Sequence, residues 1–196
     1  LRPTIASGSY VQGIRLVDDN VRIQGIEFDF TDVSVVTAFM GVYGGGSENY
    51  IQDSIFHGLD NSGGSDYVAG FYFDSGTIYL SNNILYDITH DNVEAYGIFK
   101  FNATVYAYHN TVFDVKTTSA SAYGFRRTGT TPFLAKNNYA GDIVSSASSE
   151  YCFWGTFVAG STNNASADDT AAAASGMTNG NIWLDKYSSY FVDVKA

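Results

Sequence analysis

Short stretches of alternating apolar and polar residues, separated by bends rich in Gly, Asn and Ser, cover most of this chain. One such unit predicts three strands, over residues 96–101, 105–108 and 111–115, followed by a loop over residues 116–121. Alternation with a period of two is typical of strands that bury one face, and no 3.6-residue stripe is sustained. The pattern therefore predicts an all-β protein.

The unit recurs about every 28 residues, with three landmarks in register. The first is a Gly followed by an apolar residue, with Cys in the sixth copy: Gly13, Gly41, Gly70, Gly97, Gly124 and Cys152. The second follows 12 to 14 residues later: Gly25, Ser54, Asn83, Asn110, Asn138 and Asn164. The third lies four residues beyond: Asp29, Gly58, Asp87, Asp114, Asp142 and Asp168. One such unit cannot bury its apolar face alone, so the repeat predicts stacked coils.

Three strands per coil and a period of 27–29 residues predict a single-stranded right-handed parallel β-helix of six to seven coils. The chain is interpreted as one domain, residues 1–196, with regular coils over about residues 10–170 and an irregular segment over 171–196. Further strands are expected near residues 182–184 and 190–192. Because a solenoid needs capped ends and the pattern shows none, we expect a fragment of a longer chain or a stacked partner.

Equivalent positions of successive coils should form columns. Three columns are expected to face inward: Ile14, Val42, Phe71, Ile98, Phe125 and Phe153; Ile26, Ile55, Ile84, Thr111, Tyr139 and Ala165; and Phe30, Leu59, Ile88, Val115 and Ile143. One column next to the first should face outward: Arg15, Tyr43, Tyr72, Phe99, Arg126 and Trp154. Tyr96, Tyr123 and Tyr151 form a neighbouring column. Exposed aromatic residues with interspersed Arg fit either sugar or partner binding or plain stacking between coils.

Composition narrows the functional classes. Charged residues are only 15% of the chain, against roughly 25% in average domains, and aromatic residues reach 16%, so disorder and coiled coils are excluded. The net charge is −10 without a basic stripe, which argues against nucleic-acid partners. The longest apolar stretch, residues 68–73, is too short for membrane insertion. Cys152 is the single cysteine and forms no internal disulfide.

The chain resembles the pectate-lyase-like superfamily of right-handed β-helices, and it is similar to repeat proteins of bacteria and phages. The resemblance covers about residues 10 to 170 and rests on four phrases, at residues 82–88, 109–115, 136–142 and 162–169. It implies that Asn83, Asn110, Asn138 and Asn164 form an asparagine ladder at a bend, linked by their amide groups. It does not imply one activity, because the superfamily includes lyases, hydrolases, tailspikes, adhesins and inert fibres.

The recurring acids leave three alternatives open. Asp29, Asp87, Asp114, Asp142 and Asp168 are expected to cap turns by accepting hydrogen bonds from backbone N–H groups. Alternatively, carboxylates spaced about 5 Å apart could bind calcium at Asp87, Asp114 and Asp142, the one cofactor considered. The third alternative is catalysis, with Asp114, Asp142 and Arg126 as candidates.

Two functions remain. The preferred one is an extracellular, cell-surface or virion-associated structural and adhesive β-helix. Tyr43, Tyr72, Phe99, Arg126 and Trp154 would form its face for glycans or for sister chains, assembled as a homotrimer or an end-to-end fibre. The alternative is a polysaccharide lyase or glycoside hydrolase acting on an extracellular polysaccharide.

Overall fold

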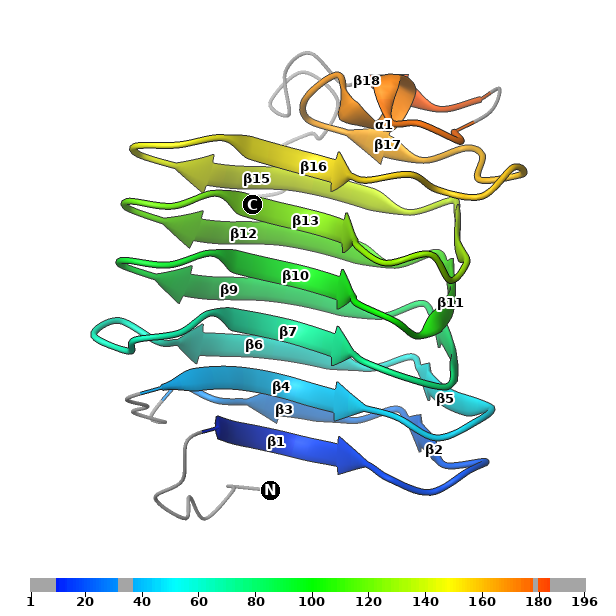
Figure 1. The fold of residues 1–196 in the computed structure, drawn as a ribbon, viewed down its shortest axis with the longest axis horizontal. Helices are drawn as coiled ribbons and strands as arrows, with labels where there is room; N and C mark the ends of the chain where they lie inside the picture. Colours follow the sequence, from blue (N-terminus) through cyan, green and yellow to red (C-terminus); the bar gives the residue numbers. More distant parts are fainter. Residues whose placement is uncertain (1–9, 32–36, 178–179, 184–196) are drawn as a thin grey trace, which may run out of the picture.

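A computed structural model describes residues 10–31, 37–177 and 180–183. Within these residues the chain winds through three parallel sheets and rises in a right-handed sense (Figure 1). Five complete three-strand turns are followed by an incomplete sixth turn in the described part of the chain. The predicted all-β parallel β-helix is confirmed, with about five turns in place of six to seven. A strand forms at Ile182–Trp183 (β18), whereas the one expected at residues 190–192 lies outside the described residues.

The front sheet contains the first strand of each turn. Its strands are, in spatial order, β1 (Tyr10–Leu16), β4 (Ala38–Gly44), β7 (Val68–Phe73), β10 (Ala95–Lys100), β13 (Ala122–Arg127) and β16 (Glu150–Trp154). All neighbouring pairs are parallel and in register, so that Ile98 lies between Phe71 and Phe125. Equivalent residues therefore stack along the solenoid.

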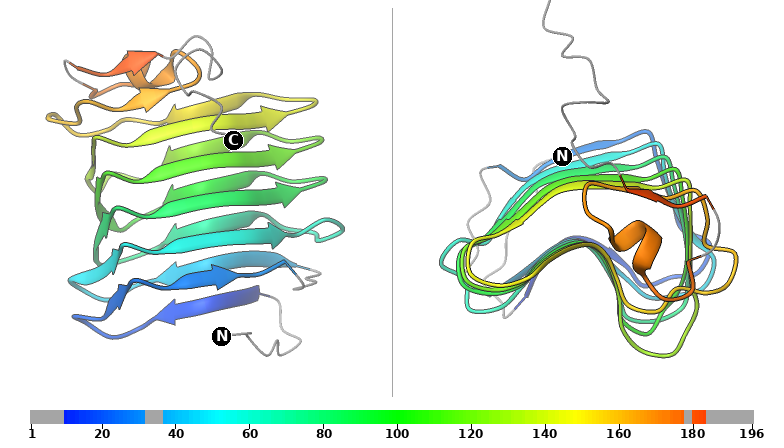
Figure 2. Two further views of the ribbon diagram at one scale, coloured as in Figure 1. Left: turned by 180° about the vertical axis from the view of Figure 1, so that it is seen from behind. Right: turned by 90° about the horizontal axis from the view of Figure 1, so that it is seen from above.

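The other two sheets complete each turn. The side sheet contains β2 (Arg22–Gln24), β5 (Asn49–Gln52), β8 (Thr77–Ser81), β11 (Thr104–Tyr108) and β14 (Phe133–Lys136). The back sheet contains β3 (Glu27–Asp29), β6 (Ile55–Asp60), β9 (Ile84–His90), β12 (Thr111–Thr117), β15 (Tyr139–Ser145), β17 (Ala165–Ser166) and β18. Figure 2 shows from above how these walls enclose one interior.

The interior is filled by columns of like residues. The column of Val42 and Phe71 is buried as predicted, and so is the column of Leu59 and Ile88. The column through Ile84 is wrong: Ile84 is 37% exposed and Ile26 is 39% exposed. Asn83 already occupies the inward position before Ile84, so strand alternation turns Ile84 outward. The inward column here is Phe28, Phe56, Leu85, Val112, Ala140 and Ser166.

The recurring Gly of the front sheet lets this sheet lie close to the back sheet. A side chain at Gly70 would place its Cβ 2.6 Å from Leu85 Cδ2, and one at Gly124 would place it 2.9 Å from Ala140 Cβ. Real Cβ atoms do not approach other heavy atoms so closely, so only Gly fits here. Seen from above, the front wall is indented towards the interior (Figure 2). The outer surface of the front sheet is therefore concave.

The end of the solenoid beyond β16 is covered by α1 (Thr170–Ala173). Ala171 is fully buried there. The Cys152 N–H donates to Asp168 Oδ2 at 2.8 Å, and the Phe153 N–H donates to Thr170 Oγ1 at 2.9 Å. Two donors of the last strand of the front sheet are thus satisfied by side chains. This differs from the expectation that the solenoid has no cap.

Candidate functional site

The asparagine ladder runs through the interior at the bend between the side and back sheets. Each Asn amide donates to the Oδ1 of the next Asn: Asn83 to Asn110 at 2.9 Å, Asn110 to Asn138 at 3.1 Å and Asn138 to Asn164 at 3.0 Å. Each backbone N–H of these three residues donates to the same oxygen. All four side chains are buried, so the ladder serves the fold.

Two features of the ladder were not predicted. The left-handed backbone belongs to the residue before each rung, such as Asn82 (φ 56°) and His109 (φ 57°), and not to the rung itself. Glu27 pairs with Ile55, so the first coil is shifted by one residue from the predicted alignment. Gly25 (φ 66°) therefore corresponds to the left-handed residue before a rung, and not to a rung. Asn181 adds a further rung, with Asn164 Nδ2 donating to Asn181 Oδ1 at 2.9 Å. This rung could not be recognised from the repeat, because Asn181 follows Asn164 by 17 residues and not by about 28.

The recurring acids do not share one role. Asp29 accepts the Thr31 N–H at 2.9 Å and Asp168 accepts the Thr170 N–H at 3.0 Å, as expected for acids that cap turns. Asp29 lies opposite His57, one position before the predicted register. Asp87, Asp114 and Asp142 instead have left-handed backbones within the back sheet, with φ between 50° and 55°. Gly58 (φ 73°) takes the same position in the second turn.

Lys116 offsets part of the negative charge of the acids in the back sheet. Lys116 forms an ion pair with Asp114. This hydrogen bond, together with the charges of Asp114, Asp142 and Asp87, raises the pKa of Lys116, against the lowering effect of burial. Among the described residues, no group of three or more His, Cys, Asp or Glu side chains is arranged to hold a metal ion. The calcium alternative thus stays without a ligand set in this part of the chain.

The three catalytic candidates are not brought together. Asp114 and Asp142 lie in β12 and β15 of the back sheet, whereas Arg126 lies in β13 of the front sheet. Arg126 is engaged by Glu94, whose Oε1 accepts from Nη1 at 3.0 Å. The arrangement offers Asp114 and Asp142 no shared site with this arginine.

The concave outer face of the front sheet contains a second apolar cluster. Pairing confirms the predicted outward column, in which Arg126 lies between Phe99 and Trp154. The cluster consists of Ala38, Met40, Ala69, Tyr96, Phe99 and Tyr123, with Tyr43, Tyr67, Tyr72, Tyr151 and Trp154 packed against it. We call this surface the aromatic face. The front sheet is concave at the recurring Gly, so the column that contains Tyr96 and Tyr123 lies close to the column that contains Phe99 and Trp154.

Arg126 lies among four aromatic rings of the aromatic face, those of Tyr96, Phe99, Tyr123 and Trp154. Its guanidinium carbon is 4.4 Å from the ring centroid of Tyr123 and 5.1 Å from that of Trp154. Tyr96 donates to Glu94 Oε2 at 2.6 Å and accepts from Arg126. Burial raises the pKa of the Tyr96 hydroxyl, which the Arg126 charge partly offsets. Arg126 is thus a structural cation within this network.

Aromatic residues also line the outside of the other two sheets, where they form closed stacks, in which a ring lies parallel to a neighbour on each of its two faces. In the side sheet, Tyr79 lies 4.8 Å from Tyr50 and 5.1 Å from Tyr106, with interplanar angles of 11°. In the back sheet, Tyr86 is stacked between His57 and Phe113 in the same way. Both faces of the inner rings are therefore covered by neighbours, as in a structural ladder.

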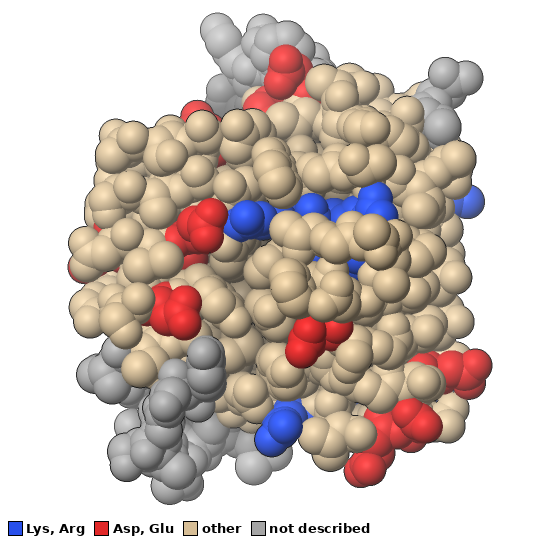
Figure 3. Space-filling view, in the orientation of Figure 1, with Lys and Arg blue, Asp and Glu red and all other residues tan. Residues whose placement is uncertain are grey.

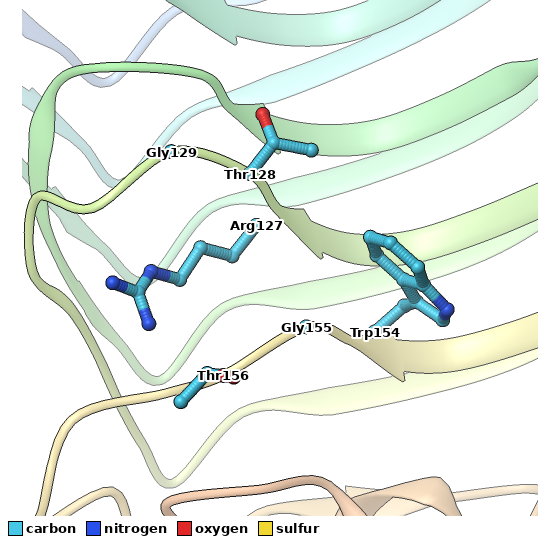
Figure 4. A pocket seen from close by; sticks show the side chains of 6 residues that line it. All are labelled: Arg127, Thr128, Gly129, Trp154, Gly155 and Thr156. Carbon is cyan, nitrogen blue, oxygen red and sulfur yellow. The ribbon is translucent and has the colours of Figure 1, made fainter.

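The stacking on the aromatic face is regular in part. Tyr72 is stacked with Tyr43 and with Tyr67, and Tyr123 is stacked with Tyr96 and with Tyr151. It is interrupted at two places. Phe99 is perpendicular to Tyr72, at 89°, and Trp154 is inclined by 67° to Tyr123. A pocket of about 220 Å³ opens beside Tyr72 and is lined by Gln12, Met40, Tyr43, Tyr67 and Tyr72. A second pocket, of about 280 Å³, opens beside Trp154 and is lined by Arg127, Thr128, Gly129, Trp154, Gly155 and Thr156 (Figure 4). The two pockets leave room for a ligand.

The five predicted face residues thus divide into two groups. Phe99 is only 7% exposed and Arg126 is engaged by its neighbours, so both support the surface. Tyr43, Tyr72 and Trp154 are partly exposed and line the two pockets. Sequence reasoning missed Tyr67, Arg127 and the pocket glycines. Their only signal was their position at the ends of front-sheet strands.

Comparisons with protein families, with curated proteins and with solved structures find no match to this chain. Among the described residues, no helix has the length and apolar character needed to cross a membrane. The function is therefore inferred from the sequence and structure of this chain.

Proposed function

We propose that this chain is a structural and adhesive β-helix that binds a glycan along its aromatic face. The observation that carries the proposal is the pair of pockets on the aromatic face. Tyr72, which is stacked with Tyr43 and Tyr67, borders one pocket, and Trp154, which is inclined to Tyr123, borders the other. Sugar rings pack their apolar faces on such half-exposed aromatic residues.

The two pockets suit an extended ligand. Tyr43 and Trp154 belong to the same column and are separated by four interstrand steps, about 19 Å at roughly 4.8 Å per step. Each pocket combines aromatic surface with a few polar groups, including Gln12 in one and Thr156 in the other. Ligand sites commonly join apolar walls to a small number of polar contacts in this way. A chain of sugars running along the solenoid axis would use both pockets.

The proposal places the protein outside the cell, at a cell surface or on a virion. The regular repeat and the resemblance to the pectate-lyase-like superfamily, with its adhesins and tailspikes, favour a structural role with a binding face. A second copy of the chain is the competing occupant of the aromatic face, because exposed aromatic residues also fit a protein interface. The test must therefore distinguish sugar from self-association.

The test combines a glycan array with tryptophan fluorescence. The chain has two Trp residues, so a Trp183→Phe variant leaves Trp154 as the single reporter in the second pocket. We expect saturable quenching of Trp154 by the glycans that bind on the array, with a molar mass by light scattering that stays monomeric. A panel of neutral and acidic polysaccharides that leaves the fluorescence unchanged, together with a concentration-dependent dimer, would contradict the proposal.

A further inference from the structure

The pocket beside Trp154 lies where two front-sheet strands end. Arg127, Thr128 and Gly129 follow from β13, and Trp154, Gly155 and Thr156 follow from β16. In Figure 4 the Arg127 side chain extends away from the Trp154 ring, and Gly155 lies between these two residues. A ligand lying over Gly155 would meet an aromatic ring at one end and a cation at the other.

The positive charge at this pocket is not compensated by acids. Arg127 pairs in register with Lys100 of the neighbouring turn, so two cations occupy adjacent levels. The four ion pairs of the described chain involve other residues: His57 with Glu27, His57 with Asp29, Lys116 with Asp114, and Arg126 with Glu94. The protein carries a net charge of −10, so this local excess of positive charge is unusual.

Backbone carbonyls hold both cations in place. The Lys100 side chain is fully buried, and its Nζ donates to the Thr128 carbonyl at 2.9 Å. Arg127 donates from Nε to Thr131 O at 3.2 Å and from Nη2 to Thr130 O at 3.1 Å. These bonds fix the orientation of the guanidinium, and among the described residues its Nη1 group has no hydrogen-bond partner. Figure 3 shows a row of basic side chains across this face, with an acidic group against one end of the row.

The effect of this charge is visible in Lys100. Burial, and secondly the charge of Arg127, lower the pKa of Lys100 to about 8. Burying the Lys100 and Arg127 charges side by side without a carboxylate costs free energy. An anion bound at the pocket would reduce the repulsion between them. A guanidinium also matches the geometry of a carboxylate or sulfate, with which it forms charge-assisted hydrogen bonds.

Gly155 keeps the floor of the pocket open. Its φ is 112°, and a side chain there would place a Cβ 2.5 Å from the carbonyl oxygen of Arg127. Only Gly adopts this conformation readily, so the backbone of β16 can approach that of β13. The space over this backbone, between Trp154 and Arg127, is therefore available to a ligand.

We propose that this pocket binds an oxyanion carried by a sugar ring, with the ring packed on Trp154 and the oxyanion bound by Arg127. The inference rests on the proposed glycan function and narrows the ligand to sugars that carry a carboxylate or a sulfate ester. The two sources share one chemistry and differ in geometry, and the experiment separates them.

The probes are glucuronate, glucose 6-sulfate and neutral glucose, titrated against the Trp183→Phe protein while Trp154 fluorescence is recorded. Thr156 is exposed and lines the pocket, so Thr156→Glu adds a negative charge without disturbing the core, and Thr156→Gln is its neutral control. We expect at least one anionic sugar to bind about tenfold more tightly than glucose, as one charge-assisted hydrogen bond would give. Thr156→Glu should abolish this preference, and Thr156→Gln should keep it.

Arg127→Met provides a second, direct test, with Arg22→Met on the side sheet as its control. Loss of the anionic preference in Arg127→Met alone would support the site. Equal binding of glucose and both anionic sugars would overturn this inference and leave the glycan proposal standing. Anionic sugars that bind here while no polysaccharide binds would instead support the pocket and overturn the glycan proposal. If both Thr156→Glu and Arg127→Met still prefer anionic sugars, the anion binds elsewhere, and the proposed site is refuted.

Discussion

Asp87, Asp114 and Asp142 have φ angles of 54°, 55° and 50°, in the left-handed region of backbone space. Asp and Asn tolerate this region better than other residues with a side chain, and Gly tolerates it best, which explains Gly58 at the same position. The sequence indicated a recurring turn acid. It did not show that the backbone conformation, more than the carboxylate, requires these residues.

This reading predicts different effects for two substitutions of Asp114. Both Asp114→Gly and Asp114→Val remove the carboxylate and its ion pair with Lys116. Only Val suffers a steric conflict at φ 55°, so its free energy of unfolding should be lower than that of the Gly variant by about 1–2 kcal/mol. Denaturant unfolding measures the difference, and equal stabilities of the two variants would show that the backbone argument is wrong.

Lys100 should make stability depend on alkaline pH. Its pKa of about 8 in the folded protein lies below that of an unfolded lysine, so the unfolded state binds more protons between about pH 8 and 10. The free energy of unfolding should therefore rise with pH in this window, relative to Lys100→Met. Thermal unfolding of both proteins from pH 7 to 10 checks the sign. If the stability of the wild type relative to Lys100→Met stays constant or falls with rising pH, the pKa of Lys100 is not lowered by burial.

The asparagine ladder links successive turns into one element of the fold. Asn110 donates to Asn138 and to Leu80 O, and it accepts from the backbone and side chain of Asn83. Removing this rung leaves several polar groups of the buried ladder without partners. Ser54 shows within the same chain that a shorter polar side chain can end the ladder, since it accepts the Ile26 N–H.

Asn110→Ala should therefore lower the free energy of unfolding by about 3 kcal/mol, given roughly 1–3 kcal/mol for each orphaned group. Asn110→Ser should cost less, because a hydroxyl can satisfy part of the network as Ser54 does. The two variants are compared by denaturant unfolding. A Ser variant as unstable as the Ala variant would mean that filled volume, and not hydrogen bonding, explains the ladder.

The elements show where sequence reasoning succeeded and where it failed. Strand positions and most columns follow from period-two alternation, which is local. The inward column through Ile84 failed because Asn83, a polar residue, takes the buried position. The two pockets could not be predicted, because each is lined by residues of different turns, such as Gln12 with Tyr67 and Arg127 with Trp154, whose positions are set by the fold and not by local alternation.

The whole solenoid depends on its cover at the β16 end. Asp168 and Thr170 accept the N–H groups of Cys152 and Phe153, and Ala171 packs on the end of the core. An open edge of parallel strands is a template for pairing with another chain, which such a cover prevents. Among the described residues, α1 and the segment before it therefore cover this edge of the front sheet.

Disrupting the cover should expose that edge. Ala171→Glu buries a charge and should destabilise the protein by at least about 3 kcal/mol, with self-association detected by light scattering. Ala172→Glu lies on the exposed side of the same helix and serves as the control. A monodisperse Ala171→Glu protein with unchanged stability would show that α1 does not protect the end.

The central claim concerns one face of the molecule, and the most direct test compares two tyrosines of similar setting. Tyr72 belongs to the aromatic face and Tyr79 to the closed stack of the side sheet. Calorimetric titration of a glycan that binds the wild-type chain is repeated with Tyr72→Leu and Tyr79→Leu, after both variants are shown to fold. We expect Tyr72→Leu to weaken binding about tenfold and Tyr79→Leu to leave the affinity unchanged. Equal affinities for the two variants, whether both weakened or both intact, would contradict glycan binding at the aromatic face.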